Sequence, residues 1–152
     1  MNMKLTPITQ AGFDKLKKDL ANYISLRPEA VFNLKTAREM GDLSENAAYH
    51  AARQRLNQID YHIRTLTYQI KTSRVYNSVS NGTVQIGSKV VVNVGIEKKE
   101  FHIVGGYESD PSIGKISVFS PIGKALLGKK EGEKVTVGIP AGEITYTIES
   151  IT

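Results

Sequence analysis

The pattern of apolar and polar positions changes its period once along this chain, near residue 80. Between Phe13 and Ile70, apolar or small residues recur at alternating steps of three and four, which is the period of two helices packed along one seam. These seam positions are Phe13, Leu16, Leu20, Tyr23, Ala30, Leu34 and Ala37, followed by Ala52, Leu56, Ile59, Ile63, Leu66 and Ile70. A polar stretch at residues 41–50 separates the two runs. The pattern therefore predicts an antiparallel α-helical coiled-coil hairpin with residues 41–50 at its tip.

Local residues predict where these two helices begin and end. Thr9 is a good N-cap for the first helix. Pro28 predicts a kink or short break, because proline removes a backbone hydrogen bond and clashes with the preceding turn. Gly41 suits the left-handed position that ends many helices. The second helix is expected over residues 43–76.

Beyond residue 82 the period becomes two, which is typical of strands. Strands are expected at residues 90–94, 101–104, 116–119, 135–137 and 144–148. A short helix is expected at residues 120–128, because it begins with serine and proline and ends with glycine. The prediction is an α+β chain: a coiled-coil hairpin (residues 1–76), a linker (77–82) and a small globular α+β domain (83–152).

Composition narrows the function classes. The 152 residues include no cysteine, which excludes disulfides, thiol nucleophiles and cysteine metal sites. Neither a signal-peptide core nor a membrane-spanning stretch is visible in the sequence, so we expect a cytoplasmic protein with no membrane partner. His50, His62 and His102 have no metal-site spacing.

Excess positive charge lies entirely in the helical half. Residues 1–79 hold 12 Lys and Arg against 7 Asp and Glu, whereas residues 80–152 hold 8 of each. A basic helical surface suggests a polyanionic partner, most simply nucleic acid. On charge alone, a solvated helix exterior explains the same excess and is the preferred interpretation.

Two acidic residues at the tip, Asp42 and Glu45, have two compatible interpretations. Asp-x-x-Glu at a helix start is close to a capping box, with Asp42 as the N-cap. Alternatively, two carboxylates three residues apart on a first helical turn can share a hard cation such as Mg²⁺. Such a pair binds an ion weakly by itself. Placed in a site that already holds one metal and an RNA phosphate, it can retain a second metal for phosphodiester hydrolysis.

Three motifs resemble those of the bacterial Gre family of transcript cleavage factors, and are closest in wording to its GreA branch. They are GDLSENA followed by YHAAR (residues 41–53), SPIGKALLGK (120–129) and PAGE (140–143). The motifs occur in both halves of the chain and in the family's order. The resemblance covers essentially the whole chain.

The resemblance implies a fold, a partner and a mechanism. The globular domain is expected to be similar to FKBP-type proline isomerases and to dock on bacterial RNA polymerase. The hairpin is expected to enter the secondary channel, where Asp42 and Glu45 help hold the second catalytic Mg²⁺ while the polymerase cleaves backtracked RNA. The chain itself is expected to be no enzyme and to bind no cofactor stably, since the Mg²⁺ is shared with the polymerase.

Six further residues carry contact predictions. Three arginines flank the tip: Arg38, Arg53 and Arg55. They are candidates to contact phosphates at the 3′ end of backtracked RNA. The alternative is that they only form an ordinary basic helix surface. The resemblance places Ser120, Pro121 and Ile122 in the polymerase-docking region, although their pattern is first of all that of a helix start.

Three positions depart from the family pattern. Ala48 stands where the family commonly has glutamate, and Ala141 stands where it commonly has glycine. Gly123 stands where alanine is common, so we expect the short helix to be slightly looser. Ala48 keeps open a second function, a polymerase-binding inhibitor or adaptor without cleavage. A proline isomerase with a helical appendage is a third possibility that rests on fold analogy alone. The C-terminal half has no Trp and few aromatics, which disfavours a proline-binding pocket.

Overall fold

The computed structural model describes residues 5–79 and 81–152 and divides into two compact units. One unit contains the described residues up to Phe13 together with Ser73–Thr152, and the other is Asp14–Thr72. The α+β class is confirmed, but the boundaries differ from those expected at residues 76 and 83. Residues 73–76 belong to the globular unit because β2 (Ser73–Val75) pairs in parallel with β1 (Thr6–Ile8). Ser80 of the expected linker lies outside the described residues, as do residues 1–4.

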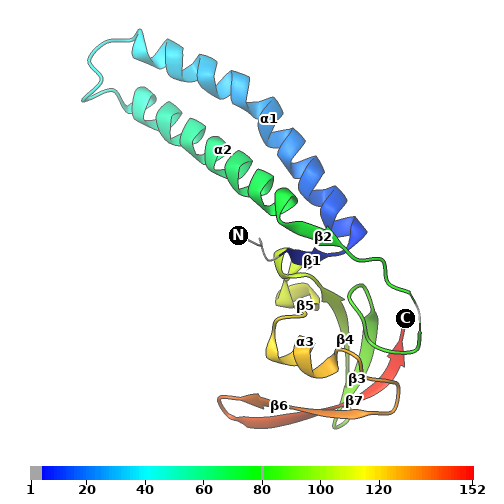
Figure 1. The fold of residues 1–152 in the computed structure, drawn as a ribbon. Helices are drawn as coiled ribbons and strands as arrows, with labels where there is room; N and C mark the ends of the chain where they lie inside the picture. Colours follow the sequence, from blue (N-terminus) through cyan, green and yellow to red (C-terminus); the bar gives the residue numbers. More distant parts are fainter. Residues whose placement is uncertain (1–4, 80) are drawn as a thin grey trace. The chain divides into compact units, whose positions relative to one another are not determined.

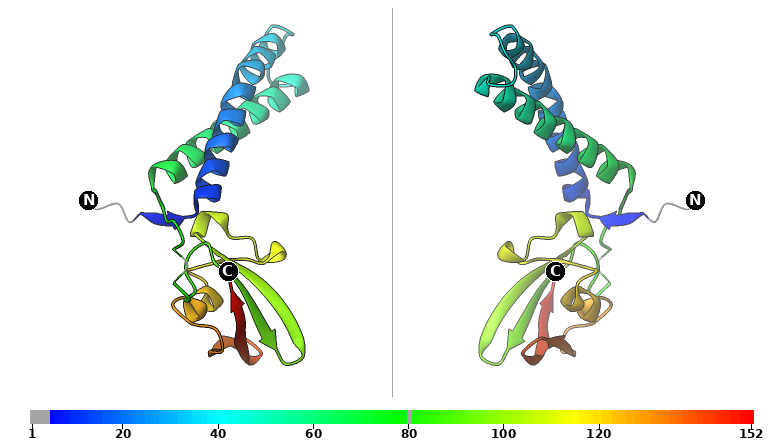
Figure 2. Two further views of the ribbon diagram at one scale, coloured as in Figure 1. Left: turned by 90° about the vertical axis from the view of Figure 1, so that its right-hand side faces the viewer. Right: turned by 90° about the vertical axis from the view of Figure 1, so that its left-hand side faces the viewer.

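The two long helices are α1 (Gln10–Arg38) and α2 (Ala47–Lys71), which form the predicted antiparallel hairpin (Figure 1). In the turned views of Figure 2 the two helices cross each other. Every predicted seam position is buried or half-buried, with Leu16, Ala30 and Ile59 among the most buried. The helical period therefore located the hairpin interface correctly. In the described part of the chain, no helix is long and apolar enough to cross a bilayer.

Pro28 does not break α1, so the short break given as one of the two expected effects of this proline is wrong. The helix runs continuously from Gln10 to Arg38 with Pro28 exposed on its surface. Contacts with α2 hold the helix just before Pro28: the rings of Tyr23 and His62 stack with centroids 4.4 Å apart. Arg27, which interrupts the apolar run, donates to Asp60 of α2 at 2.7 Å. The helix is kept by packing against its partner despite the missing hydrogen bond.

The expected limits of α2 are also corrected. It begins at Ala47 rather than residue 43, and ends at Lys71 rather than residue 76. Thr72 closes the helix, since its backbone N–H and its hydroxyl both donate to the Tyr68 carbonyl. The chain then turns into β2, because pairing with β1 satisfies its backbone groups.

Five strands of the globular unit form one sheet in the order β5-β4-β3-β7-β6. Their bounds are β3 Lys89–Val94, β4 Glu97–Val104, β5 Lys115–Ser117, β6 Lys134–Ile139 and β7 Gly142–Ile151. Only the β4–β5 pairing is parallel among them, so the sheet is mostly antiparallel, as predicted. Two 3₁₀ helices, η1 (Gly106–Glu108) and η2 (Pro111–Ile113), connect β4 to β5.

Helix α3 (Pro121–Leu126) lies beside β5 and β6 and completes this unit (Figures 1 and 2). The core between sheet and helix is aliphatic, with one aromatic pair, Phe101 and Tyr146, whose centroids lie 5.8 Å apart. Alternate residues of the strands supply it, which explains why the period of two predicted them. Its most buried members are Val90, Val92, Ile103, Leu126 and Ile148.

Helix α1 starts at a polar cluster in the globular unit. The Thr9 hydroxyl accepts from the Gly12 N–H at 3.0 Å, which confirms Thr9 as the N-cap. Glu108 of η1 in turn accepts from the Thr9 N–H at 2.9 Å, from the Thr9 hydroxyl and from the Gly105 N–H at 3.2 Å. One carboxylate thus joins positions far apart in the sequence and complements the helix dipole.

Candidate functional site at the hairpin tip

Residues 39–46 form the loop that joins the two long helices, and we call them the tip loop. The last turn of α1 tightens as the Glu39 and Met40 N–H groups donate to the carbonyls of Thr36 and Ala37. Gly41 adopts a φ of 124°, a region that favours glycine. It lies beyond the end of α1, however, so it shapes the loop instead of capping the helix.

Asn46, which the sequence did not single out, is the N-cap of α2. Its side-chain oxygen accepts from the Tyr49 N–H at 3.0 Å. Its amide nitrogen donates to the Ala37 carbonyl of α1 at 2.8 Å. The expected capping box with Asp42 as N-cap is therefore wrong. Asparagine directly before a helical run is a strong N-cap pattern, and this was the available signal.

Asp42 instead stabilises a turn inside the tip loop. The backbone N–H and the hydroxyl of Ser44 both donate to Asp42 Oδ1, each at 3.0 Å. The backbone bond first, and the hydroxyl bond second, hold the pKa of Asp42 below its ordinary value. Asp42 is thus ionised at neutral pH, with Oδ1 engaged.

Glu45 lies exposed in the same loop, one residue before the N-cap. The two carboxylates therefore sit on a loop and not on the first turn of a helix, which corrects the expected geometry. Within residues 5–79 and 81–152, no three His, Asp or Glu side chains gather in a way that could hold a metal ion. Two exposed carboxylates are nevertheless a donor set that suits a hard cation supplied with other ligands.

The flanking arginines are divided between two faces. The Arg38 guanidinium lies 5.8 Å from the Tyr49 ring centroid, and Arg53 follows Tyr49 by one turn of α2. Arg55 faces another direction and lines a small hollow with Glu29 of α1. The structure therefore brings Arg38 and Arg53 to neighbouring positions around Tyr49 and leaves Arg55 apart.

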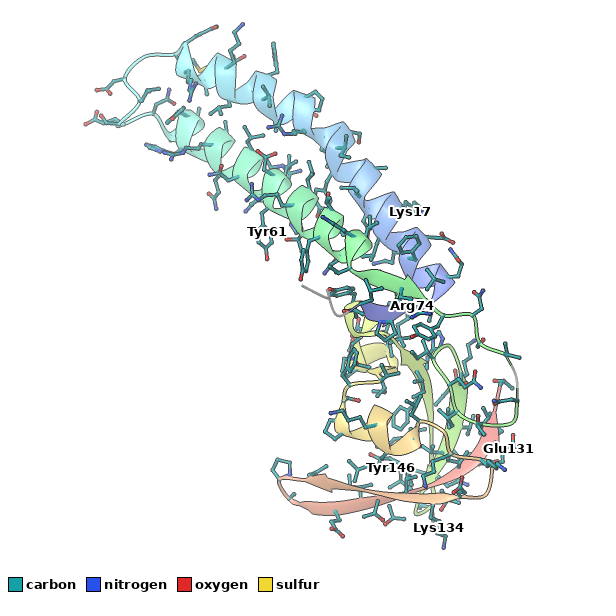
Figure 3. All side chains as sticks on the ribbon, viewed as in Figure 1. Lys17, Tyr61, Arg74, Glu131, Lys134 and Tyr146 are labelled. Carbon is teal, nitrogen blue, oxygen red and sulfur yellow. The ribbon has the colours of Figure 1, made fainter. Side chains whose placement is uncertain are left out.

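A shallow hollow of about 410 Å³ runs along α2 beside Arg53. It is lined by His50, Arg53, Gln54, Asn57, Gln58, Tyr61 and His62. Tyr61 is 59% exposed and projects from α2 on the side away from α1 (Figure 3). This face of α2 carries polar residues, since the apolar seam residues face α1. The sequence pattern therefore gave no sign of a hollow here.

A second candidate surface lies in the globular unit, around the start of α3. Ser120 caps α3: its hydroxyl accepts from the Gly123 N–H at 3.0 Å and donates to the Ser117 carbonyl at 2.7 Å. Ser120, Pro121 and Ile122 line an apolar groove of about 330 Å³. The remaining lining residues are Ser109, Pro111, Ile116, Ser117, Val137, Gly138, Ile139 and Pro140. None of these described residues is aromatic, unlike a typical proline-binding groove.

Gly123 has a packing role that the sequence did not reveal. It is buried, and a Cβ built on it would lie 2.0 Å from the Ser117 carbonyl oxygen. The absence of a side chain lets α3 approach the end of β5. Glycine is therefore required by close packing here, which differs from the expected loosening of the helix.

These features define a class of protein in which a helical hairpin with an exposed acidic tip loop accompanies a small α+β unit. Residues 6–75 match the family "Transcription elongation factor, N-terminal", and residues 79–152 match "Transcription elongation factor, GreA/GreB, C-term". The chain belongs to the GreA/GreB family of transcription elongation factors.

Individual relatives span nearly the whole chain. It is 44% identical to transcription elongation factor GreA of Thermodesulfovibrio yellowstonii, covering 95% of both chains. It is 40% identical to GreA of Lactococcus lactis, covering 97% of this chain and 98% of that one. The crystal structure of the GreA factor homolog 1 protein of Thermus thermophilus is 25% identical, with a TM-score of 0.47 over 97% of this chain and 99% of that one.

Proposed function

We propose that this protein binds bacterial RNA polymerase and stimulates cleavage of backtracked RNA. The hairpin enters the secondary channel, and the tip loop brings Asp42 and Glu45 to the second Mg²⁺ of the polymerase active centre. Cleavage takes place on the polymerase in the cytoplasm, so the factor supplies ligands and is itself no enzyme. The observation that carries this proposal is a pair of exposed carboxylates, Asp42 and Glu45, on the loop of a hairpin in a chain of this family.

The two carboxylates have distinct tasks in this proposal. Asp42 accepts two hydrogen bonds from Ser44 at Oδ1, so its other oxygen would be the one that holds the metal. Glu45, for which the structure assigns no such turn, adds the second ligand. When bound there, the Mg²⁺ would supply charge stabilisation for phosphodiester hydrolysis. The chain provides only part of the coordination, consistent with Mg²⁺ that keeps waters and substrate phosphates.

The neighbouring arginines contact the extruded 3′ end of the RNA. Arg38 and Arg53 lie around Tyr49 and are the better candidates for its phosphates. Arg55 was expected to take part, but its position opposite Glu29 makes it the weakest of the three. Arginine at exposed positions gives a contact that weakens as salt rises.

Ser120, Pro121 and Ile122 take part in docking on the polymerase. They line the apolar groove beside α3, where Pro121 is exposed and Ile122 half-buried. An apolar groove with a few polar groups suits a protein surface better than a phosphate backbone. The two tasks, docking and metal retention, are thus assigned to different units.

The test is RNA cleavage in a stalled, backtracked bacterial polymerase complex with Mg²⁺. The native chain is compared with Asp42→Ala, Glu45→Ala and the matched control Glu39→Ala, which removes an exposed carboxylate from the same loop. We expect native protein and control to shorten the RNA and both tip variants to fail while binding the polymerase. Equal cleavage by Asp42→Ala would refute the metal-ligand role.

The alternative is a polymerase-binding inhibitor or adaptor of the same architecture. Its supporting observation is Ala48, an exposed alanine in the first turn of α2 where a carboxylate would add a third acidic group. This alternative predicts that the native chain binds the polymerase and blocks or alters RNA synthesis without shortening backtracked RNA.

A further inference from the structure

We propose that Asn46 is a positioning residue that holds the tip loop in the conformation needed by Asp42 and Glu45. The inference rests on the proposed function and adds a residue to it. Asn46 touches neither metal nor RNA in this account. It acts by joining the end of α1 to the start of α2 in the same loop as the two carboxylates.

The contacts of Asn46 join both helices through one side chain. Its Nδ2 donates to the Ala37 carbonyl at 2.8 Å, and its Oδ1 accepts from the Tyr49 N–H at 3.0 Å. Ala37 is buried in the hairpin seam, with 5% of its surface exposed, so its carbonyl is a fixed anchor. A helix leaves its last carbonyls and first N–H groups without intrahelical partners. Asn46 satisfies the Tyr49 N–H and gives the Ala37 carbonyl a second, shorter hydrogen bond beside the one at 3.3 Å from the Met40 N–H, and thereby closes the loop at its base.

Only a side-chain amide can make both contacts. An N-cap requires an acceptor, which serine, aspartate and asparagine all provide about equally well. Donation to a carbonyl of the facing helix requires an N–H at the length of an asparagine side chain. An aspartate would place its negative charge against the Ala37 carbonyl oxygen. The cap and the cross-link can therefore be separated by mutation.

The positions of the other tip-loop residues depend on this cross-link between the helices. Glu45 is the residue immediately before Asn46, and Asp42 is held by Ser44. The Ser44 carbonyl in turn accepts from the His50 ring nitrogen at 3.3 Å, which connects the turn to α2. If the base opens, both carboxylates sample more positions, and a ligand that is out of place by about 1 Å can lose most of its effect.

The test compares Asn46→Asp and Asn46→Ser, which keep the cap acceptor, with Asn46→Ala, which loses both contacts. Asn33→Asp, an exposed position on α1, is the control for added negative charge. Backtracked-RNA cleavage is titrated with Mg²⁺, and polymerase affinity is measured separately. We expect all three Asn46 variants to raise the half-saturating Mg²⁺ concentration by about fivefold or more, the effect of losing one hydrogen bond. Polymerase affinity and the Asn33→Asp titration should match the native chain.

Hydrogen exchange of the free protein gives a readout that needs no polymerase. The Ser44 amide, protected by Asp42, should exchange faster in Asn46→Asp, whereas the amides in the middle of α2 should not change. If Asn46→Asp and Asn46→Ser behave as native in both measurements and only Asn46→Ala is impaired, Asn46 is a helix cap and the inference is refuted. If the native chain does not stimulate cleavage, the proposed function fails, and the exchange result alone decides whether Asn46 orders the loop.

Discussion

Replacing Gly123 with alanine should destabilise the globular unit, although alanine is the better helix former. Helix propensity alone predicts a gain of about 1 kcal/mol for this change. The structure opposes it, because the new Cβ would lie 2.0 Å from the Ser117 carbonyl oxygen and 3.1 Å from the Ser120 hydroxyl. The Ser117 carbonyl cannot simply move, since it accepts from the Ser120 N–H at 3.0 Å and from its hydroxyl at 2.7 Å.

The expected magnitude follows from these opposing effects. Forcing one methyl group into a packed site costs about 1–3 kcal/mol. If Ser117 moves away, each weakened hydrogen bond costs about 1 kcal/mol more. With one of these bonds weakened and the propensity gain subtracted, Gly123→Ala should lower the free energy of unfolding by about 1–3 kcal/mol. For a unit of this size, that lowers the melting temperature by at least about 5 °C.

Differential scanning calorimetry of the full chain is the assay, since it resolves the two units if they melt separately. Gly138→Ala is the matched control, because a Cβ at that exposed strand position meets nothing within 4 Å. The control should melt within about 2 °C of the native chain, as is usual for a surface substitution. A Gly123→Ala protein as stable as the native chain, or more so, would refute the close-packing argument.

Three further predictions concern other local contacts. Glu108→Ala should lower the free energy of unfolding by about 2–3 kcal/mol in urea titrations, because the Thr9 N–H, the Thr9 hydroxyl and the Gly105 N–H lose their acceptor. Pro28→Ala should raise the melting temperature of the hairpin, since it restores a hydrogen bond in a continuous helix at a site where proline costs up to about 3 kcal/mol. Ser44→Ala should raise the pKa of Asp42 in an NMR titration without restoring its ordinary value, because the backbone bond remains. As the pKa is lowered in the folded state, the stability from this turn is present at neutral pH and is lost as pH falls through that pKa.

The sequence predicted the fold well wherever one face of an element is buried. The seam residues of the hairpin and the alternating residues of β3 and β7 mark their own burial through their period. Element ends were less predictable. The second helix was expected to reach residue 76, yet residues 73–75 become β2 because β1, distant in sequence, offers a pairing partner. That information is tertiary and is not contained in the local pattern.

For the candidate site, the sequence suggested which residues matter but did not predict their local structure. Motif resemblance identified Asp42 and Glu45, and their exposure on the tip loop agrees with a surface role. Their local structure was predicted incorrectly, because a cap at Asp42 and a cap at Asn46 both satisfy capping preferences. Asn46 is the N-cap in the structure because its amide also donates to the Ala37 carbonyl at the end of α1. The requirement for glycine at position 123 likewise depends on a carbonyl of β5.

The most direct test of the central claim is the Mg²⁺ dependence of RNA cleavage in a backtracked polymerase complex, with and without the native chain and Asp42→Asn. If the tip carboxylates retain the second metal, the native chain should lower the half-saturating Mg²⁺ concentration, and Asp42→Asn should abolish that shift at unchanged polymerase affinity. A native chain that leaves the half-saturating concentration unchanged, or an Asp42→Asn variant that lowers it equally, would contradict the account.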